Sequence, residues 1–341
     1  MDASHQEFET LAIEGGGRDK AAALAGAIKA GDGGVARDLA ALWIHAAARA
    51  PGRLAEIYDG SALGWLGKAP EVPAIDGDAT RVAIPARFWA EFWALVSNNA
   101  IGDAGAVTQK TAALSGQLDG KFKHAAADAA LTYPGVVESA AQGYPERFTM
   151  RALARAPAGS LGAQFHHLID SNGFDLEVLD RDALGLSDLP APLGYLNARI
   201  LQCHDLWHIT AGYETTGLHE VAISGFQAGQ FGHHYSSMFL GIVLTKIAFA
   251  EGESVGLMLD TILSAWTHGR ESPPLLGVGW PGIWNQPVDQ VRARLNLAPY
   301  AYHIQPISLS KCAHNSADTR RDLSGLRYLE TPPWSQSPQP D

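Results

Sequence analysis

Residues 193–211 read LGYLNARILQCHDLWHITA, and this stretch decides the fold class of the chain. It lies between Pro192 and Gly212, and a glycine just past the last residue of an apolar period is a common end of a helix. The stretch therefore predicts a helix from about Leu193 to Ala211. After Gly217, the apolar pattern predicts a second long helix from about Leu218 to Ala250.

The sequence on both sides is also helical in pattern. Alanine and leucine, which are strong helix formers, dominate residues 20–69 and predict two or three helices there. More helices are expected over 88–141, 253–268 and 288–297, whereas the Pro- and Gly-containing stretch 71–85 predicts a linker or a short extended segment. No segment shows the alternation that is typical of a strand. We therefore expect an all-α protein, a multi-helix core with its site between two long helices.

The chain divides into three regions by pattern. Residues 1–92 are predicted to be an N-terminal helical extension and residues 93–330 the helical core. Residues 331–341 are predicted to be a disordered tail, because four of these eleven residues are prolines. Within the extension, Gly15-Gly16-Gly17 lacks both the preceding strand and the following lysine of a phosphate-binding loop. We expect these three glycines to be flexible chain.

Composition and charge limit the classes of function. Of 341 residues, 46% are hydrophobic and 18% are charged, which is enough apolar sequence for a large core. The 25 basic and 36 acidic residues give a formal net charge of −11, and no basic run stands out, so we expect no nucleic-acid partner. Two cysteines cannot form a disulfide framework, and no apolar run approaches the roughly 18 residues of a membrane span. These features predict a cytoplasmic protein whose membrane contact is peripheral.

Four residues form a candidate metal site. His204 and His208 are four residues apart, so on a helix they project from nearly the same face, where two imidazoles can hold one divalent ion. Asp205 stands where the HExxH metalloproteases carry glutamate, and it can be either a ligand or an acceptor that orients a histidine. Glu220 follows twelve residues later, and the turn that begins at Gly212 can bring it back opposite the two histidines. Histidines at this spacing also occur in ordinary helices, so the spacing alone leaves both interpretations open.

Four further polar residues are candidates for lining the same pocket. Gln227 and His234 lie seven and fourteen residues after the glutamate, within about 40° of its helical face, and Asn197 lies seven residues before the first histidine. The alternative for all three is an ordinary solvated helix face. Arg270 can pair with a substrate carboxylate or phosphate, and the alternative is a structural salt bridge.

The motif His204-Asp205-x-x-His208, followed by eleven residues and Glu220, resembles the metal motif of the Coq-four family of ubiquinone (coenzyme Q) biosynthesis proteins. Flanking segments are similar too: Ala158–Gly162 resembles the small-residue loop of that family, and Gly269-Arg270 with Pro274 to Trp280 resembles its C-terminal segment. The resemblance covers roughly residues 93–297.

The resemblance implies an all-helical fold and a divalent metal held by His204, Asp205, His208 and Glu220. Zinc is the first expectation; because zinc cannot supply electrons, an oxidative step favours iron, manganese or cobalt. The implied reaction is an oxidative decarboxylation of a polyprenylated, hydroxybenzoate-derived aromatic ring, in which a hydroxyl replaces the carboxyl. The implied setting is a homodimer that works with other quinone biosynthesis proteins, peripheral at the inner face of the membrane.

Two other functions fit the same residues. One is a non-catalytic carrier or scaffold that presents lipid intermediates to other enzymes, with the metal as a structural clamp. The other is a metal-dependent hydrolase, which needs further His or Asp ligands beside the His-Asp pair.

Overall fold

The computed structural model describes residues 2–97, 104–177, 179–250 and 254–301. Within them the regular elements are helices, and strand pairing is limited to an isolated bridge between Ser160 and Pro287. The predicted all-α class is confirmed. In chain order the α-helices are α1 (Ala3–Glu14), α2 (Arg18–Lys29), α3 (Ala36–Ala48), α4 (Leu54–Leu66), α5 (Ala86–Val96), α6 (Ala104–Gly116), α7 (Gly120–Ala130), α8 (Val136–Ala140), α9 (Met150–Leu153), α10 (Leu161–Asn172), α11 (Leu193–Ala211), α12 (Gly217–Phe231), α13 (His234–Phe249), α14 (Ser254–Glu271) and α15 (Val288–Leu295).

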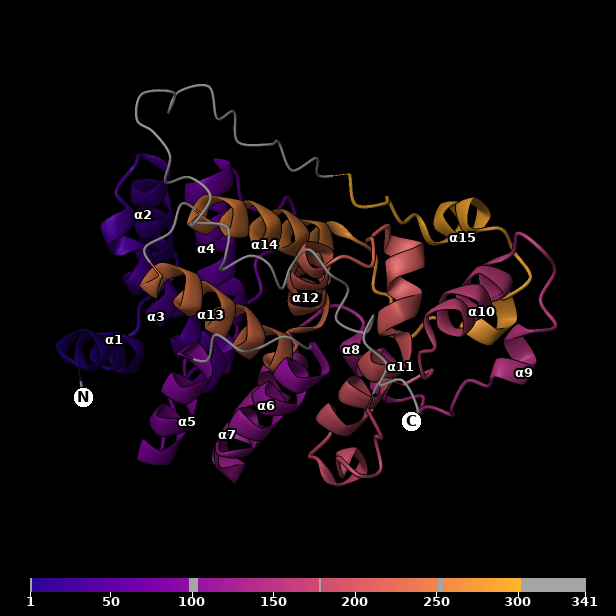
Figure 1. Cartoon of the computed structure of the whole chain (residues 1–341), viewed down its shortest axis with the longest axis horizontal. Coiled ribbons are helices and arrows are strands. Elements are labelled where there is room, and N and C mark those ends of the chain that lie inside the picture. The colour runs from indigo at the N-terminus through magenta and orange to yellow at the C-terminus, as the bar shows by residue number, and fades with distance from the viewer. Residues whose placement is uncertain (1, 98–103, 178, 251–253, 302–341) are drawn as a thin grey trace, which may run out of the picture.

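The N-terminal helices pack directly on the C-terminal ones. In Figure 1, α1 to α4 lie beside α13 and α14; α3 packs against α13 and α4 against α14. Helix α3 is buried along most of its length because alanine fills many of its positions and lets neighbouring helices approach. One cluster of buried apolar side chains runs from Phe8 to Leu297, so the first helices share the core that supports the rest of the fold.

Helix α11 runs from Leu193 to Ala211, as predicted, and ends at Gly212 in the left-handed conformation, with φ of 82°. The predicted single helix from about Leu218 to Ala250 is wrong, because the structure divides it into α12 and α13. The break lies at Gly232, whose φ of 61° ends α12 with a left-handed residue. Because the helix is broken at Gly232, the polypeptide changes direction there, and the first residues of α13 contact α12.

The glycine run near the N-terminus is packed rather than flexible, so that expectation is also wrong. Helix α1 ends at Gly15, whose φ is 72°. The imidazole of His45 lies so close to Gly15 that a Cβ added there would be 2.3 Å from the ring. Glycine is needed at this position for both its backbone conformation and its close contact. Helix α1 lies within the predicted N-terminal helical extension, and its apolar positions Phe8 and Ala12 are buried.

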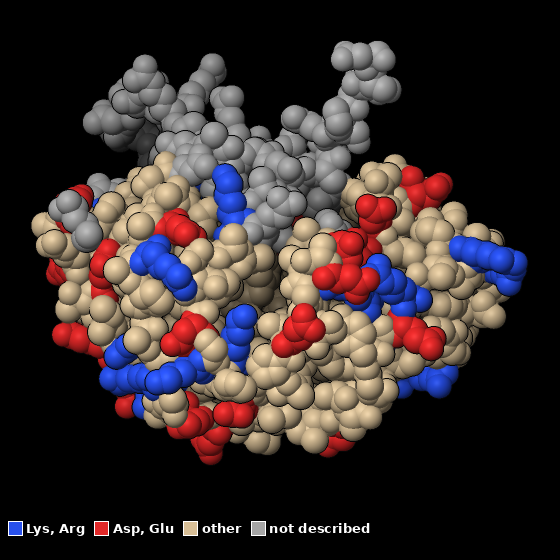
Figure 2. Space-filling view, turned by 90° about the horizontal axis from the view of Figure 1, so that it is seen from below, with Lys and Arg blue, Asp and Glu red and all other residues tan. Residues whose placement is uncertain are grey.

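No described helix is both long and apolar enough to cross a membrane. Over the face in Figure 2, Lys and Arg side chains are interspersed with Asp and Glu, and no large area carries charge of one sign. The stretch 71–85 contains no helix, in agreement with the predicted linker or extended segment. The predicted disordered tail, 331–341, lies outside the described residues.

Candidate metal centre

The end of α11 and the start of α12 bring the predicted metal residues together. His204 and His208 lie one turn apart near the end of α11, just before Gly212 reverses the chain. Helix α12 begins after Thr216, whose hydroxyl accepts a hydrogen bond from the backbone N–H of His219. This cap places Glu220 in the first turn of α12, opposite the two histidines, as predicted from the glycines between them.

Three donor groups converge on one point. The Nε2 atoms of His204 and His208 lie 3.3 Å apart. The carboxylate of Glu220 places Oε2 3.1 Å from Nε2 of His204 and Oε1 3.3 Å from Nε2 of His208. Zinc–nitrogen bonds of 2.0–2.1 Å in a tetrahedral site put neighbouring donors about 3.3 Å apart, so these separations match one face of such a site. Oε1 is buried and, despite its nearness to His208, has no partner in hydrogen-bond geometry among the described residues.

The tautomer of His208 is set by two backbone carbonyls. Its Nδ1 lies 3.3 Å from the carbonyl oxygen of Tyr213 and 3.1 Å from that of Glu214. A carbonyl oxygen can only accept, so Nδ1 carries the proton and donates it. The lone pair of the neutral ring is then on Nε2, the atom that faces His204 and Glu220. This arrangement is typical of metal-bound histidines, whose other ring nitrogen donates to an acceptor.

Burial and the ion pairs shift the pKa values of this group. Burial alone would raise the pKa of Glu220, but the nearness of the His208 imidazole and the hydrogen bond from His204 lower it to about 2. Burial would lower the pKa of His208, but the negative charge of Glu220 outweighs it and raises the pKa. The pKa of the Asp205 carboxyl is raised, chiefly by burial. Glu220 therefore carries negative charge in a partly buried site.

Asp205 lies at the same centre. One ligand atom from each of His204, Asp205 and His208 lies within 4.8 Å of the others. Among the residues that the structure describes, this is the group of three or more His, Cys, Asp or Glu side chains that could hold a metal ion. The geometry is compatible with Asp205 as a further ligand and with Asp205 as an acceptor beside the ligands.

Of the other predicted residues, Gln227 contacts the metal residues, and Asn197 and His234 have buried polar atoms without a hydrogen-bond partner in the described part of the chain. Nε2 of Gln227 lies 2.8 Å from Nδ1 of His204. Asn197 Oδ1 and His234 Nδ1 are both buried and lack a hydrogen-bond partner among the described residues. The ring of His234 lies 6.1 Å from that of Phe122, on α7. Both keep their predicted role as candidates for substrate contact.

Arg270 is not brought to the metal residues. Its guanidinium pairs with Asp59 on α4 at 3.5 Å, and both side chains are buried. The same carboxylate accepts a hydrogen bond from the indole N–H of Trp266. Arg270 lies against Gly229, near the end of α12, whereas Glu220 is at the start of that helix. This is the structural salt bridge that was the alternative for Arg270.

Several residues at the centre were not expected from the sequence. Tyr213 and Glu214 contribute only backbone carbonyls, which carry no signal in a residue pattern. Ser236 and His233 join Gln227 through hydrogen bonds, although adjacent histidines at 233 and 234 had suggested no site. Their contacts depend on the break at Gly232, which the sequence pattern did not indicate.

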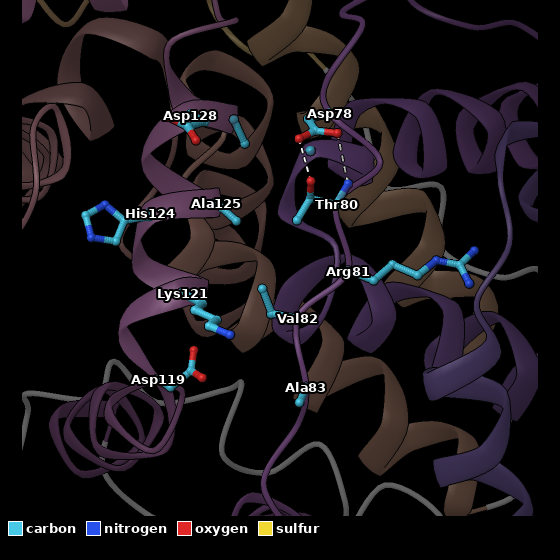
Figure 3. Close-up of a pocket in the computed structure, with 12 residues that line it drawn as sticks. Asp78, Thr80, Arg81, Val82, Ala83, Asp119, Lys121, His124, Ala125 and Asp128 are labelled. Atoms are coloured by element: carbon cyan, nitrogen blue, oxygen red, sulfur yellow. Dashed lines mark hydrogen bonds between the residues drawn. The ribbon is translucent and has the colours of Figure 1, made fainter.

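A separate cavity of about 450 Å³ lies between the extended segment around Thr80 and α7 (Figure 3). Charged groups of both signs line it, among them Asp78 and Lys121. Thr80 donates both its N–H and its hydroxyl to the carboxylate of Asp78. None of the predicted site residues lines this cavity.

Comparison with known proteins shows a family match over part of the chain. Residues 144–301 match the family described as "Coenzyme Q (ubiquinone) biosynthesis protein Coq4", and this segment contains all four predicted metal residues. Over this segment the chain is similar to the Coq4 family. Residues 1–143 lie outside the matched segment, and the predicted division at residue 92 stays a prediction.

Similar proteins include the mitochondrial ubiquinone biosynthesis protein COQ4 homologue of Mus musculus, which is 28% identical over 156 residues, 46% of this chain and 57% of that protein. The Homo sapiens homologue is 26% identical over the same shares, and the Eremothecium gossypii protein is 26% identical over 43% of this chain and 44% of its own length. The chain thus covers about half the length of the curated relatives it matches. A crystal structure of a putative ubiquinone biosynthesis protein from Nostoc punctiforme aligns with a TM-score of 0.47 and 19% identity, over 62% of this chain and 96% of that one.

Proposed function

We propose that this chain acts in ubiquinone biosynthesis as a metal-dependent enzyme. The proposed reaction replaces the carboxyl of a polyprenylated, hydroxybenzoate-derived ring by a hydroxyl. The observation that carries the proposal is the convergence of His204, His208 and Glu220 within 3.3 Å, inside the segment that matches the family. Asp205 completes a set of two imidazoles and two carboxylates at one point.

When bound, a divalent ion supplies a Lewis acid that stabilises negative charge on a substrate oxygen. His208 is held with its Nε2 lone pair directed at that position by the carbonyls of Tyr213 and Glu214. Glu220 balances the positive charge of the ion with a carboxylate that is already ionised at neutral pH. The low exposure of these groups strengthens their interactions with a charged ring oxygen, because little water competes.

The donor set suits zinc and also the redox-active ions iron, manganese and cobalt. Loss of the carboxyl as carbon dioxide and gain of a hydroxyl is a net two-electron oxidation of the ring. We take dioxygen as the oxidant: it accepts the two electrons and is reduced to hydrogen peroxide, while water balances the added hydroxyl. Zinc can bind and polarise the substrate but cannot pass electrons from the ring to dioxygen. An oxidative reaction at this centre is therefore expected to require iron, manganese or cobalt, and zinc is expected to support binding without turnover.

The experiment that tests this function follows the ring carboxyl. Purified protein loaded in turn with Zn²⁺, Fe²⁺, Mn²⁺ or Co²⁺ is given, in air-saturated buffer, a polyprenylated hydroxybenzoate labelled in its carboxyl carbon. We expect release of labelled carbon dioxide together with a ring that has gained one hydroxyl, and loss of both in the Glu220→Ala variant. Quinone synthesis that continues in cells carrying only Glu220→Ala would instead support the scaffold function. Phosphate or ester hydrolysis without decarboxylation would support the hydrolase.

The partners are part of the same proposal. A polyprenylated substrate resides in a bilayer, so the chain is expected to reach it by peripheral contact with the membrane and to work with other quinone biosynthesis proteins. Flotation with lipid vesicles tests the membrane contact, and light scattering tests the proposed homodimer. Protein that stays at the bottom of the gradient at all lipid concentrations would contradict the peripheral contact.

A further inference from the structure

A chain of hydrogen bonds leads from the metal centre into the protein interior. Gln227 Nε2 lies 2.8 Å from Nδ1 of His204, the ring nitrogen that faces away from Glu220. Ser236 donates its hydroxyl to Oε1 of Gln227 at 3.2 Å, and Nδ1 of His233 lies 2.8 Å from the Ser236 oxygen. The chain thus joins α11, α12 and the start of α13 through four side chains.

The three side chains behind His204 have little contact with solvent. Gln227 is 3% exposed, Ser236 is 1% exposed and His233 is 6% exposed. A buried polar group without a hydrogen bond costs roughly 1–3 kcal/mol, so each of these groups depends on its neighbour in the chain. Water has little access to replace any of them. The position of the Gln227 amide is therefore fixed by Ser236 on one side and by His204 on the other.

In each of these hydrogen bonds, the donor and the acceptor can exchange roles. In the structure, Nε2 of His204 faces a carboxylate, which can only accept, so Nε2 carries a proton and Nδ1 accepts from Gln227. A histidine that binds a metal through Nε2 carries its proton on Nδ1 and needs an acceptor there. Gln227 meets this need when its amide turns by 180°, because the amide oxygen and nitrogen then exchange places in the same space.

Ser236 and His233 can reverse the direction of their hydrogen bonds in the same way. With the amide turned, its NH₂ group donates to the oxygen of Ser236, whose hydroxyl proton turns to Nδ1 of His233. A neutral histidine can donate or accept at Nδ1 according to its tautomer. Burial and the charges of His234 and His204 hold the pKa of His233 well below its usual value, which keeps this ring neutral. Each of the three hydrogen bonds from His204 to His233 is thus kept in either direction.

We propose that Gln227, supported by Ser236 and His233, is the positioning residue that orients His204 for metal binding through Nε2. The proposal rests on the proposed function, because it requires a metal ion at His204, His208 and Glu220. It assigns Gln227 a role different from contact with substrate. His208 is held by backbone carbonyls, which no substitution of a side chain removes, so Gln227 is the point at which ligand orientation can be tested.

Helix α12 contains a matched control. Gln230 is also buried and also makes hydrogen bonds with its side chain, but its Nε2 donates to the carbonyls of Gly269, Ser272 and Pro273. These contacts fix the end of α14 and do not reach the metal residues. Methionine has nearly the shape of glutamine without its polar atoms, so Gln227→Met and Gln230→Met remove comparable groups from the same helix.

The experiment measures Zn²⁺ affinity by competition with a chromophoric chelator, alongside thermal unfolding of the zinc-free proteins. Gln227→Met is expected to weaken Zn²⁺ binding by about 10–100-fold, the range seen when an outer partner of a metal ligand is lost. Gln230→Met is expected to lower Tm and leave Zn²⁺ affinity unchanged. Gln227→Glu, whose carboxylate accepts from Nδ1, is expected to bind Zn²⁺ at least as tightly as the wild type.

Zn²⁺ affinity of Gln227→Met equal to that of the wild type would overturn the proposal for Gln227 and leave the metal centre standing. An equal loss in Gln227→Met and Gln230→Met would also overturn it, because the effect would then be general destabilisation. If Gln227→Met does not fold, Ser236→Ala takes its place, with a smaller loss of Zn²⁺ affinity expected and an unchanged affinity contradicting the proposal. A wild-type protein that binds no divalent ion would overturn the proposed function itself.

Discussion

Replacing His45 by phenylalanine should make the protein less sensitive to acid. The ring of His45 is fully buried on α3, under Gly15, and its Nδ1 lies 2.8 Å from the carbonyl oxygen of Ala12. Burial lowers the pKa of His45 to about 4; the hydrogen bond to Ala12 opposes this shift, and the charges of nearby arginines add to it. In the unfolded chain the same group titrates near 6.5.

The sign and size of the effect follow from these two pKa values. Between pH 6.5 and 4 the unfolded chain binds a proton at His45 that the folded protein does not, so the free energy of unfolding falls as the pH falls. With pKa values of 4 and 6.5, the loss attributable to His45 is about 2 kcal/mol at pH 5 and approaches about 3 kcal/mol below pH 4. Above pH 6.5, His45 makes no contribution to the pH dependence of the free energy of unfolding. His45→Phe removes the hydrogen bond to Ala12 as well, which costs about 1 kcal/mol at neutral pH.

The assay is urea unfolding of the wild type and His45→Phe at pH 7.5 and pH 5, both with a chelator present to remove divalent ions. The wild type is expected to be the more stable protein at pH 7.5. The decrease in the free energy of unfolding between pH 7.5 and pH 5 should be larger for the wild type than for His45→Phe by about 2 kcal/mol. Other titrating groups contribute equally to both proteins and cancel. Losses that agree within about 0.5 kcal/mol would contradict a lowered pKa of His45 and place its ring in contact with water in the folded protein.

Three further predictions concern the centre and its support. Asp59→Ala leaves the buried guanidinium of Arg270 unpaired, so we expect a loss of about 3–5 kcal/mol in urea unfolding with no change in metal content; a loss of metal would contradict the separation of this pair from the centre. Thr216→Ala removes the N-cap of the helix that carries Glu220 and should cost about 1 kcal/mol, whereas an unchanged Tm would show that the cap contributes nothing. Adding Zn²⁺ at 100 times its Kd should raise the free energy of unfolding of the wild type by about 2.7 kcal/mol and leave Glu220→Ala unchanged; an equal rise in both proteins would place the ion elsewhere.

The part of the fold that the sequence predicts best is the part with strong periodicity and clear ends. Helix α11 follows an apolar pattern between Pro192 and Gly212, so both its ends were indicated. The break between α12 and α13 was missed, because an isolated glycine within an apolar run costs a helix only about 1 kcal/mol and gives a weak signal. At Gly232 the contact with Tyr133 and the left-handed conformation decide the break, and neither can be read from neighbouring residues.

The candidate site also contains residues that could be predicted from the sequence and contacts that could not. His204, His208 and Glu220 could be predicted, since helical spacing and a turn fix their relation within a short segment of chain. The partner of Arg270 could not, because Asp59 is 211 residues away and meets it only through the packing of α4 on α14. Contacts of that kind depend on tertiary packing, and they decide between a substrate-binding arginine and a structural one.

His204, His208 and Glu220 are proposed to hold one divalent ion. The most direct measurement is the metal content of the purified protein by mass spectrometry of the elements, made in parallel on His208→Ala and Glu220→Ala variants shown to be folded by circular dichroism. We predict close to one divalent ion per wild-type chain and almost none in either variant. A folded wild-type protein without a divalent ion, or variants that keep the ion, would contradict the account.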